Sequence, residues 1–262
     1  NRCVVSVAPG WYFESGIVMK SFISIIGAGP LDTTVLAFGQ DAELNFLADE
    51  PVFEIDGVRG ARLSDIGILS VGEGNVENID GIRIEENVGF NQVEISNVVI
   101  SAGGGTGEIC GVSIGGNGVA DVDINTGGTA VGAINDSIIT ATGFGAAQAI
   151  GACVSPAADV WHLERSVVTG QDSSGFNAAL GMEGPATHTG RVSGNTLTGG
   201  NAIIVGFVDV NLTIKHSDLN STTGSLVNYA GATGDIDCLF VSGNGDMLDK
   251  SCAGNVLDPN AP

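Results

Sequence analysis

A small group of basic, acidic and imidazole side chains lies close to three short apolar segments in the second half of the chain. The group comprises His162, Glu164, Arg165, Arg191, Lys215 and His216. A histidine or lysine can transfer a proton, and an arginine can stabilise developing negative charge. If the fold brings these residues together, they could seat a carboxylated or sulfated sugar and act on it. Trp161 precedes His162 and would add an aromatic face for stacking on a sugar ring.

The same residues have an alternative role as exposed ion pairs between neighbouring strands. Glu164 with Arg191 is one such pair, and pairs of this kind contribute roughly a few tenths of a kcal/mol each. Ion-pair networks gather titratable residues just as active sites do. The residue types alone therefore leave both interpretations open.

A second group combines three carboxylates with one arginine in the first third of the chain. Its members are Glu54, Asp56, Glu85 and Arg83. Oxygen ligands of this kind would bind calcium, and Arg83 could then hold a substrate carboxylate. The alternative is a solvated acidic face that one arginine neutralises. Calcium is the one cofactor that the sequence suggests.

An aliphatic segment that returns every few dozen residues would position both groups. One series of segments covers residues 63–68, 95–100, 134–139, 163–168, 192–197 and 214–219. A second series covers residues 52–55, 81–84, 111–114, 151–154, 179–182, 202–205 and 225–228. Their period-two alternation predicts short strands, and repetition at this length is typical of a solenoid. We therefore expect an all-β, single-domain parallel β-helix over residues 1–262, with about eight coils and with residues 239–262 as a capping segment.

Stacked coils would bring residues that are distant in sequence into rows. Equivalent residues on consecutive coils of a parallel β-helix lie ~4.8 Å apart. Alignment of the first series predicts one outward row of Arg62, Glu94, Ala133, His162, Arg191 and Thr213, and a second of Ser64, Ser96, Asn135, Glu164, Ser193 and Lys215. Three Asx residues directly follow members of the second row in the sequence: Asp65, Asn97 and Asp136. Asx side chains favour turns, so we expect the chain to turn at these positions.

The first coil resembles a known group of proteins. Its sequence reads Val5-Ser-Val7-Ala-Pro9-Gly10-x-Tyr12-x-Glu14, followed by Ile23-Ser-Ile25-Ile26-Gly27-Ala-Gly29-Pro30. This pattern, over about residues 4–38, is similar to the opening coil of pectinesterases and other pectate-lyase-like proteins, and the resemblance implies a right-handed β-helix. The catalytic aspartates of pectinesterases do not carry over, because Asp136-Ser-Ile-Ile-Thr140 departs from their motif at every specific position.

The five cysteines cannot all pair with one another. A bridge between Cys238 and Cys252 would pin the last segment against the final coil, and we expect that pair. Cys110 and Cys153 fall in the second series on neighbouring coils. They either form a bridge between coils or pack as small buried thiols. Cys3 is then left over.

Composition limits the possible partners. Lys and Arg number 9 against 30 Asp and Glu, a net charge of −21. This excludes nucleic acid as an expected partner, and no apolar run reaches the length of a membrane span. Strong acidity favours an exported, extracellular or cell-surface protein. We therefore expect a secreted β-helix that recognises an extracellular polysaccharide. The sequence leaves open whether it also cleaves the polysaccharide, as a lyase or a glycoside hydrolase. The alternative is a non-catalytic structural or adhesive module of a surface or tail assembly.

Overall fold

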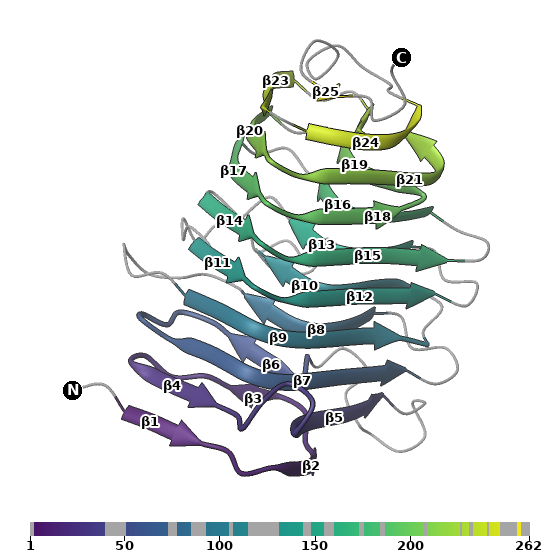
Figure 1. Ribbon diagram of the computed structural model, residues 1–262. Helices are drawn as coiled ribbons and strands as arrows, with labels where there is room; N and C mark the ends of the chain where they lie inside the picture. The colour runs from purple at the N-terminus through teal and green to yellow at the C-terminus, as the bar shows by residue number, and fades with distance from the viewer. Residues whose placement is uncertain are drawn as a thin grey trace.

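Every regular element in the described part of the chain is a β-strand, and all strand pairs are parallel. The computed structural model describes residues 3–39, 51–72, 78–84, 93–104, 107–114, 131–143, 148–154, 160–172, 176–183, 187–206, 209–225, 227–230, 233–239, 241–246 and 256–257. The strands stack as successive coils along one axis (Figure 1). These described residues include no helix of the length and hydropathy that a membrane span requires.

A small sheet takes one strand from each of eight coils. Its strands are β3 (Ile17–Val18), β6 (Phe53–Ile55), β8 (Asn78–Ile84), β10 (Glu108–Ile114), β13 (Gln148–Val154), β16 (Phe176–Glu183), β19 (Asn201–Gly206) and β22 (Val227–Ala230). These strands correspond to the second series of segments in the sequence. The eight described strands of this sheet agree with the prediction of about eight coils.

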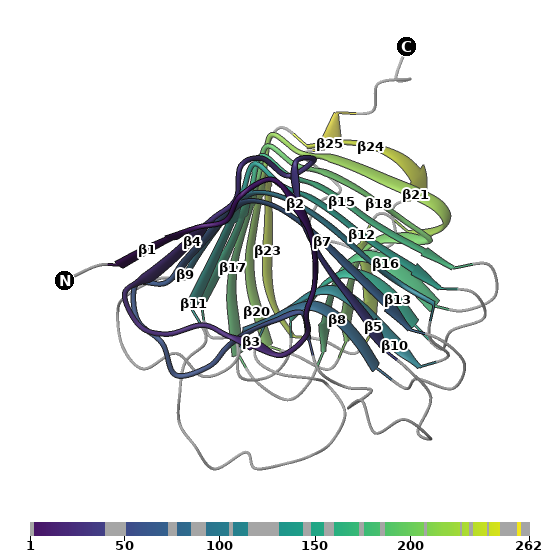
Figure 2. The same ribbon diagram turned by 90° about the horizontal axis from the view of Figure 1, so that it is seen from below.

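A large sheet bends into two arms. The first arm contains β1 (Cys3–Ser6), β4 (Ile23–Ile26), the first halves of β7 (Arg62–Gly72) and β9 (Val93–Gly103), β11 (Val131–Asn135), β14 (Val160–Glu164), β17 (Thr187–Ser193), β20 (Asp209–Lys215) and β23 (Thr233–Leu239). The second arm contains β2 (Gly10–Phe13), β5 (Thr33–Gly39), the later halves of β7 and β9, β12 (Ile138–Gly143), β15 (Val167–Asp172), β18 (Thr196–Gly199), β21 (Asp218–Ser225), β24 (Val241–Asp246) and β25 (Val256–Leu257). Figure 2 shows both arms and the small sheet around one axis.

Aliphatic side chains from the small sheet and from both arms of the large sheet fill the interior. On the first arm, register places Leu63, Ile95, Ile134, Leu163, Val192 and Ile214 directly above one another. All six are buried. Because alternate residues point to opposite sides of a strand, this inward row determines which residues point outward. The stacking predicted from the sequence is confirmed.

A left-handed residue turns the chain at the corner between the two arms. The corner positions on successive coils are Asp65, Asn97, Asp136, Arg165, Gly194 and His216, and all six have φ between 48° and 69°. The predicted turn role of Asp65, Asn97 and Asp136 is therefore confirmed. Arg165 and His216 occupy the same row. Histidine is one of the residue types enriched in this backbone conformation, whereas a long side chain such as arginine seldom adopts it.

A polar row lines the inside of this corner. Ser137, Ser166, Asn195 and Ser217 follow the left-handed residue on four successive coils, and all are buried. The backbone N–H of Ser137 donates to Ser166 Oγ at 3.2 Å, and that of Ser166 donates to Asn195 Oδ1 at 2.8 Å. The N–H of Asn195 donates to Ser217 Oγ at 3.2 Å. Each side chain thus binds the backbone of the preceding coil, which holds consecutive coils in register.

Candidate functional site

The predicted patch lies on the outer side of the first arm, over β14, β17 and β20. His162 of β14 pairs in register with Arg191 of β17, and Glu164 pairs with Ser193, which pairs in turn with Lys215 of β20. The register of both predicted outward rows is present, although Ser64 and Ser96 of the second row are buried. Arg165 and His216 follow at the exposed corner. The structure therefore brings the six predicted residues onto three adjacent coils.

Glu164 lies between two arginines. Its Oε2 accepts a hydrogen bond from Arg165 Nη1 at 3.1 Å, and its Oε1 is 3.7 Å from Arg191 Nε. The ion pair with Arg191 is the one that the sequence offered as an alternative to catalysis. Glu164 is thus already engaged as an anionic partner. This arrangement suits the positioning of cations better than the donation of a proton.

Arg165 also binds the corner carboxylate of the preceding coil. Its Nε and Nη2 donate to Asp136 Oδ1 and Oδ2 at 2.7 and 2.9 Å, a bidentate contact. These hydrogen bonds and the guanidinium charge hold the pKa of Asp136 below its usual range, and the pKa of Arg165 is raised by the same contact. Both groups therefore stay charged at neutral pH, and Arg165 is held in place by two carboxylates.

Arg191 and Lys215 are the less constrained cations of the patch. The Arg191 side chain is 51% exposed, and its ion pair with Glu164 is long at 3.7 Å. Lys215 is half-buried one coil further on, and among the described residues the structure records no ion pair for it. His162 is half-buried beside Arg191. These three side chains can contact an anionic ligand that lies along the coil axis.

Trp161 does not belong to the patch. It is 1% exposed and is part of the apolar core. A Cβ at Gly190, its register partner on β17, would overlap the indole ring. The predicted stacking of Trp161 on a sugar is therefore wrong, because the ring points inward, on the same side of the strand as Leu163.

The second predicted group is arranged differently from the expectation. Glu54 of β6 and Arg83 of β8 are register partners on adjacent coils. However, Arg83 binds Asp80, with Nη2 and Nε at 2.8 and 2.9 Å from Oδ2. The Asp80 side chain is only 2% exposed, so Arg83 neutralises a buried carboxylate that sequence reasoning missed. A role for Arg83 in binding substrate stays a prediction. Asp56 is exposed and Glu85 lies outside the described residues, so the calcium set also stays a prediction.

The cysteines form a bridge between coils. Cys110 of β10 and Cys153 of β13 make a disulfide, which decides between the two alternatives that the sequence left open. Cys238 is also disulfide-bonded, and its predicted partner Cys252 lies outside the described residues. Cys3 is free and exposed. The predicted capping segment 239–262 is described only in part, and its role is not tested.

The fold defines the chain as a right-handed parallel β-helix protein. Its structure is similar to the A-module of Azotobacter vinelandii mannuronan C-5 epimerase AlgE4, with a TM-score of 0.51 and 14% identity over 91% of this chain and 68% of that one. It is also similar to the Agl-KA catalytic domain, with a TM-score of 0.53 and 11% identity over 97% of this chain and 45% of that one.

A rice weevil pectin methyl esterase aligns with a TM-score of 0.47 and 10% identity over 89% of this chain and 82% of that one. No protein-family model matches the sequence, and no curated protein matches it either. At identities this low, the likeness to solved structures defines the fold and leaves the activity to be argued from the site.

Proposed function

We propose that the protein is an exported β-helix that binds an anionic polysaccharide along the outer side of its first arm. The observation that carries this proposal is the register of β14, β17 and β20. It gathers Arg165, Arg191 and Lys215, three of the nine Lys and Arg residues of a chain with net charge −21, on three adjacent coils. Such a local concentration of positive charge gives a polyanion a site on a protein that would otherwise repel it.

The two arginines of the patch differ in how tightly neighbouring carboxylates hold them, and this difference supports a role in binding. Arg165 is fixed by Asp136 and Glu164, whereas Arg191 stays half-exposed and can rotate toward a ligand. An arginine can form two parallel hydrogen bonds to a carboxylate or sulfate, and a lysine adds a point charge. His162 of β14 is the register partner of Arg191 and could also donate a hydrogen bond to the ligand.

The disulfide and the acidity of the chain both support export from the cell. A disulfide within the fold is typical of proteins that mature in an oxidising environment, and strong acidity suits an exported protein. The mannuronan epimerase module, whose name identifies a polyuronate as its substrate, makes uronate polymers the first class to test.

A glycan panel tests the proposal. Binding would be measured with polymannuronate, polygalacturonate, a sulfated glycan and a neutral glucan, while unsaturated and reducing ends are monitored for cleavage. We expect uronate binding that weakens about tenfold in Arg191→Ala, the loss of one charge-assisted contact. Equal binding of the neutral glucan would contradict the proposal. Products that form with wild type and disappear in His162→Ala would add catalysis to binding.

A further inference from the structure

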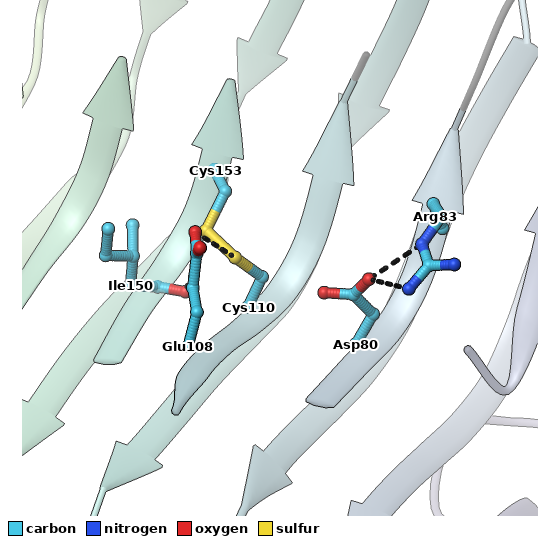
Figure 3. The surroundings of a disulfide bond; sticks show 6 residues. All are labelled: Asp80, Arg83, Glu108, Cys110, Ile150 and Cys153. Carbon is cyan, nitrogen blue, oxygen red and sulfur yellow. Dashed lines mark hydrogen bonds and ion pairs between the residues drawn. A yellow bond between two sulfur atoms is a disulfide. The ribbon is translucent and has the colours of Figure 1, made fainter. Parts of the chain in front are cut away.

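The outer side of the second arm differs in charge from the other two faces of the coil. The first arm carries the cationic patch, and the small sheet carries the ion pair of Asp80 with Arg83 next to the disulfide (Figure 3). On the second arm, register aligns uncharged residues on seven consecutive coils, from β2 through β5, β7, β9, β12 and β15 to β18. A chain of net charge −21 therefore presents a broad face without formal charge.

This face consists of three outward rows of side chains. The first row comprises Trp11, Thr34, Gly67, Val99, Ile138, Val167 and Thr196, and the second comprises Phe13, Leu36, Leu69, Ser101, Thr140, Thr169 and Thr198. A shorter third row adds Phe38, Val71, Gly103, Thr142 and Gln171. We call the outer side of these rows the uncharged face, because none of its residues carries a charge.

Large apolar side chains of the uncharged face are open to solvent. Trp11 and Phe13 are 67% exposed, Ile138 is 48% exposed, Phe38 is 46% exposed and Val167 is 43% exposed. The rings of Phe13 and Phe38 stack across adjacent coils, with centroids 6.4 Å apart. Large contiguous apolar patches are uncommon on monomeric soluble proteins and mark interaction sites.

The sequence of these strands also indicates a covered outer side. Ile138 and Ile139 are adjacent, as are Val167 and Val168, and the second member of each pair is buried in the core. A sheet with one solvated face alternates apolar and polar residues, whereas a parallel sheet covered on both faces is apolar on both. The outward positions of Ile138 and Val167 therefore fit a sheet whose outer side is buried in an assembly.

We propose that the uncharged face is the interface of a two-fold dimer, in which it packs against the same face of a second copy. Seven strands about 4.8 Å apart and five residues of about 3.3 Å each cover about 34 by 17 Å. Each copy thus offers about 570 Å², and two copies together exceed the total of about 1,000 Å² that a specific interface needs. A two-fold dimer uses the same patch on both subunits, so one face suffices.

Charge favours a second copy as the occupant. Two chains of net charge −21 repel each other, and they meet with the least local repulsion where neither surface is charged. Charged residues begin at the borders, since Thr196 pairs in register with Asp218, and Asp136 and Arg165 stand at the corner. An apolar centre with a polar rim is the usual anatomy of a protein interface, and aromatic residues are enriched in it. The dimer leaves the patch on the first arm of each copy open to a ligand.

Sedimentation equilibrium and tryptophan emission over a dilution series test the proposal. The full chain would carry Cys3→Ser, which removes a free and exposed thiol. We expect a reversible dimer whose formation shifts the emission of Trp11 to the blue with the same midpoint, while Trp161, already buried, contributes a constant signal.

Charge-introducing variants locate the interface. Ile138→Glu and Val167→Glu should each weaken the dimer about 100-fold or more, because each dimer would bury two added charges without partners. Ile138→Thr removes apolar area without adding charge and should weaken it by a smaller factor. Val4→Glu on β1 and Val18→Glu on β3 are the matched controls, since these valines are 60% and 45% exposed outside the uncharged face. Both controls should leave the dimer unchanged.

Several outcomes would overturn the proposal. A monomer at every concentration, in protein that keeps its β-sheet circular dichroism, would show that the face does not dimerise. A dimer that Ile138→Glu and Val167→Glu leave intact, or that Val4→Glu weakens as strongly, would assign association to another surface. Binding of a neutral glucan by monomeric protein, lost in Trp11→Ala and Phe13→Ala, would assign the uncharged face to a glycan instead of a second copy.

Discussion

Arg165 holds the carboxylate of Asp136 through two hydrogen bonds of 2.7 and 2.9 Å, although 29 residues separate them in the sequence. Both residues occupy the left-handed corner of their coils, with φ of 48° and 51°. The corner row thus aligns side chains as strictly as the strands do. This contact fixes one end of the cationic patch and leaves Arg191 as its adaptable member.

The first prediction concerns the pH dependence of that contact. Because Arg165 lowers the pKa of Asp136 in the folded protein, the pair stabilises the fold above the unfolded pKa of about 3.9 and ceases to do so as pH falls through the folded value. Asp136→Asn, which tolerates the left-handed corner, should lower the thermal midpoint by about 1–2 °C at pH 7. The difference from wild type should shrink steadily in circular dichroism melts below pH ~4. A difference that does not vary with pH would contradict the assignment.

The second prediction concerns the polar row inside the corner. Asn195 accepts from the N–H of Ser166 and donates to the carbonyl of Leu163, both at 2.8 Å. Asn195→Ala should leave both groups buried without a partner and cost about 2 kcal/mol, seen as a lower urea midpoint. Asn195→Ser should cost less, since serine occupies this position on neighbouring coils. Thr198→Ala, on the outer side of the second arm, is the control. Equal effects at both sites would argue against the row.

The third prediction concerns the packing of Trp161 beneath Gly190. Gly190→Ala would place a Cβ against the indole ring and should cost about 1–3 kcal/mol by overpacking. In a Trp11→Phe background, Trp161 is the remaining tryptophan, and its emission should shift to the red as the ring is displaced. Gly194→Asn, at a left-handed position with space for a side chain, should leave the emission unchanged. Unaltered emission in Gly190→Ala would contradict the buried position of Trp161.

Much of the architecture could be predicted because one physical pattern repeats. Period-two alternation around Leu163, Val192 and Ile214 determined both the inward row and the outward rows of the patch. The same rule places Trp161 inside, two residues before Leu163, so the burial of this ring could have been predicted and was missed.

Other features depend on departures from that rule. Arg165 occupies the left-handed corner, where Gly, Asn, Asp and His are the residues that propensity favours, so its place in this row had no local signal. The pairing of Asp80 with Arg83 required residues three apart to share one side of β8, which strict alternation forbids. The diagonal disulfide has the same cause. The sequence left two alternatives for Cys110 and Cys153 because a free cysteine also packs as a small buried hydrophobe.

The fourth prediction tests the central claim that stacked coils create a polyanion site. The dissociation constant for polymannuronate would be compared between Arg191→Ala/Lys215→Ala and Arg59→Ala/Lys20→Ala, which remove the same total charge, the second pair from exposed positions outside the outward rows of the first arm. We expect a loss of binding of about 10- to 100-fold for the first pair of substitutions and almost none for the second. Equal losses in both double variants, or no binding by the wild type, would contradict the central claim.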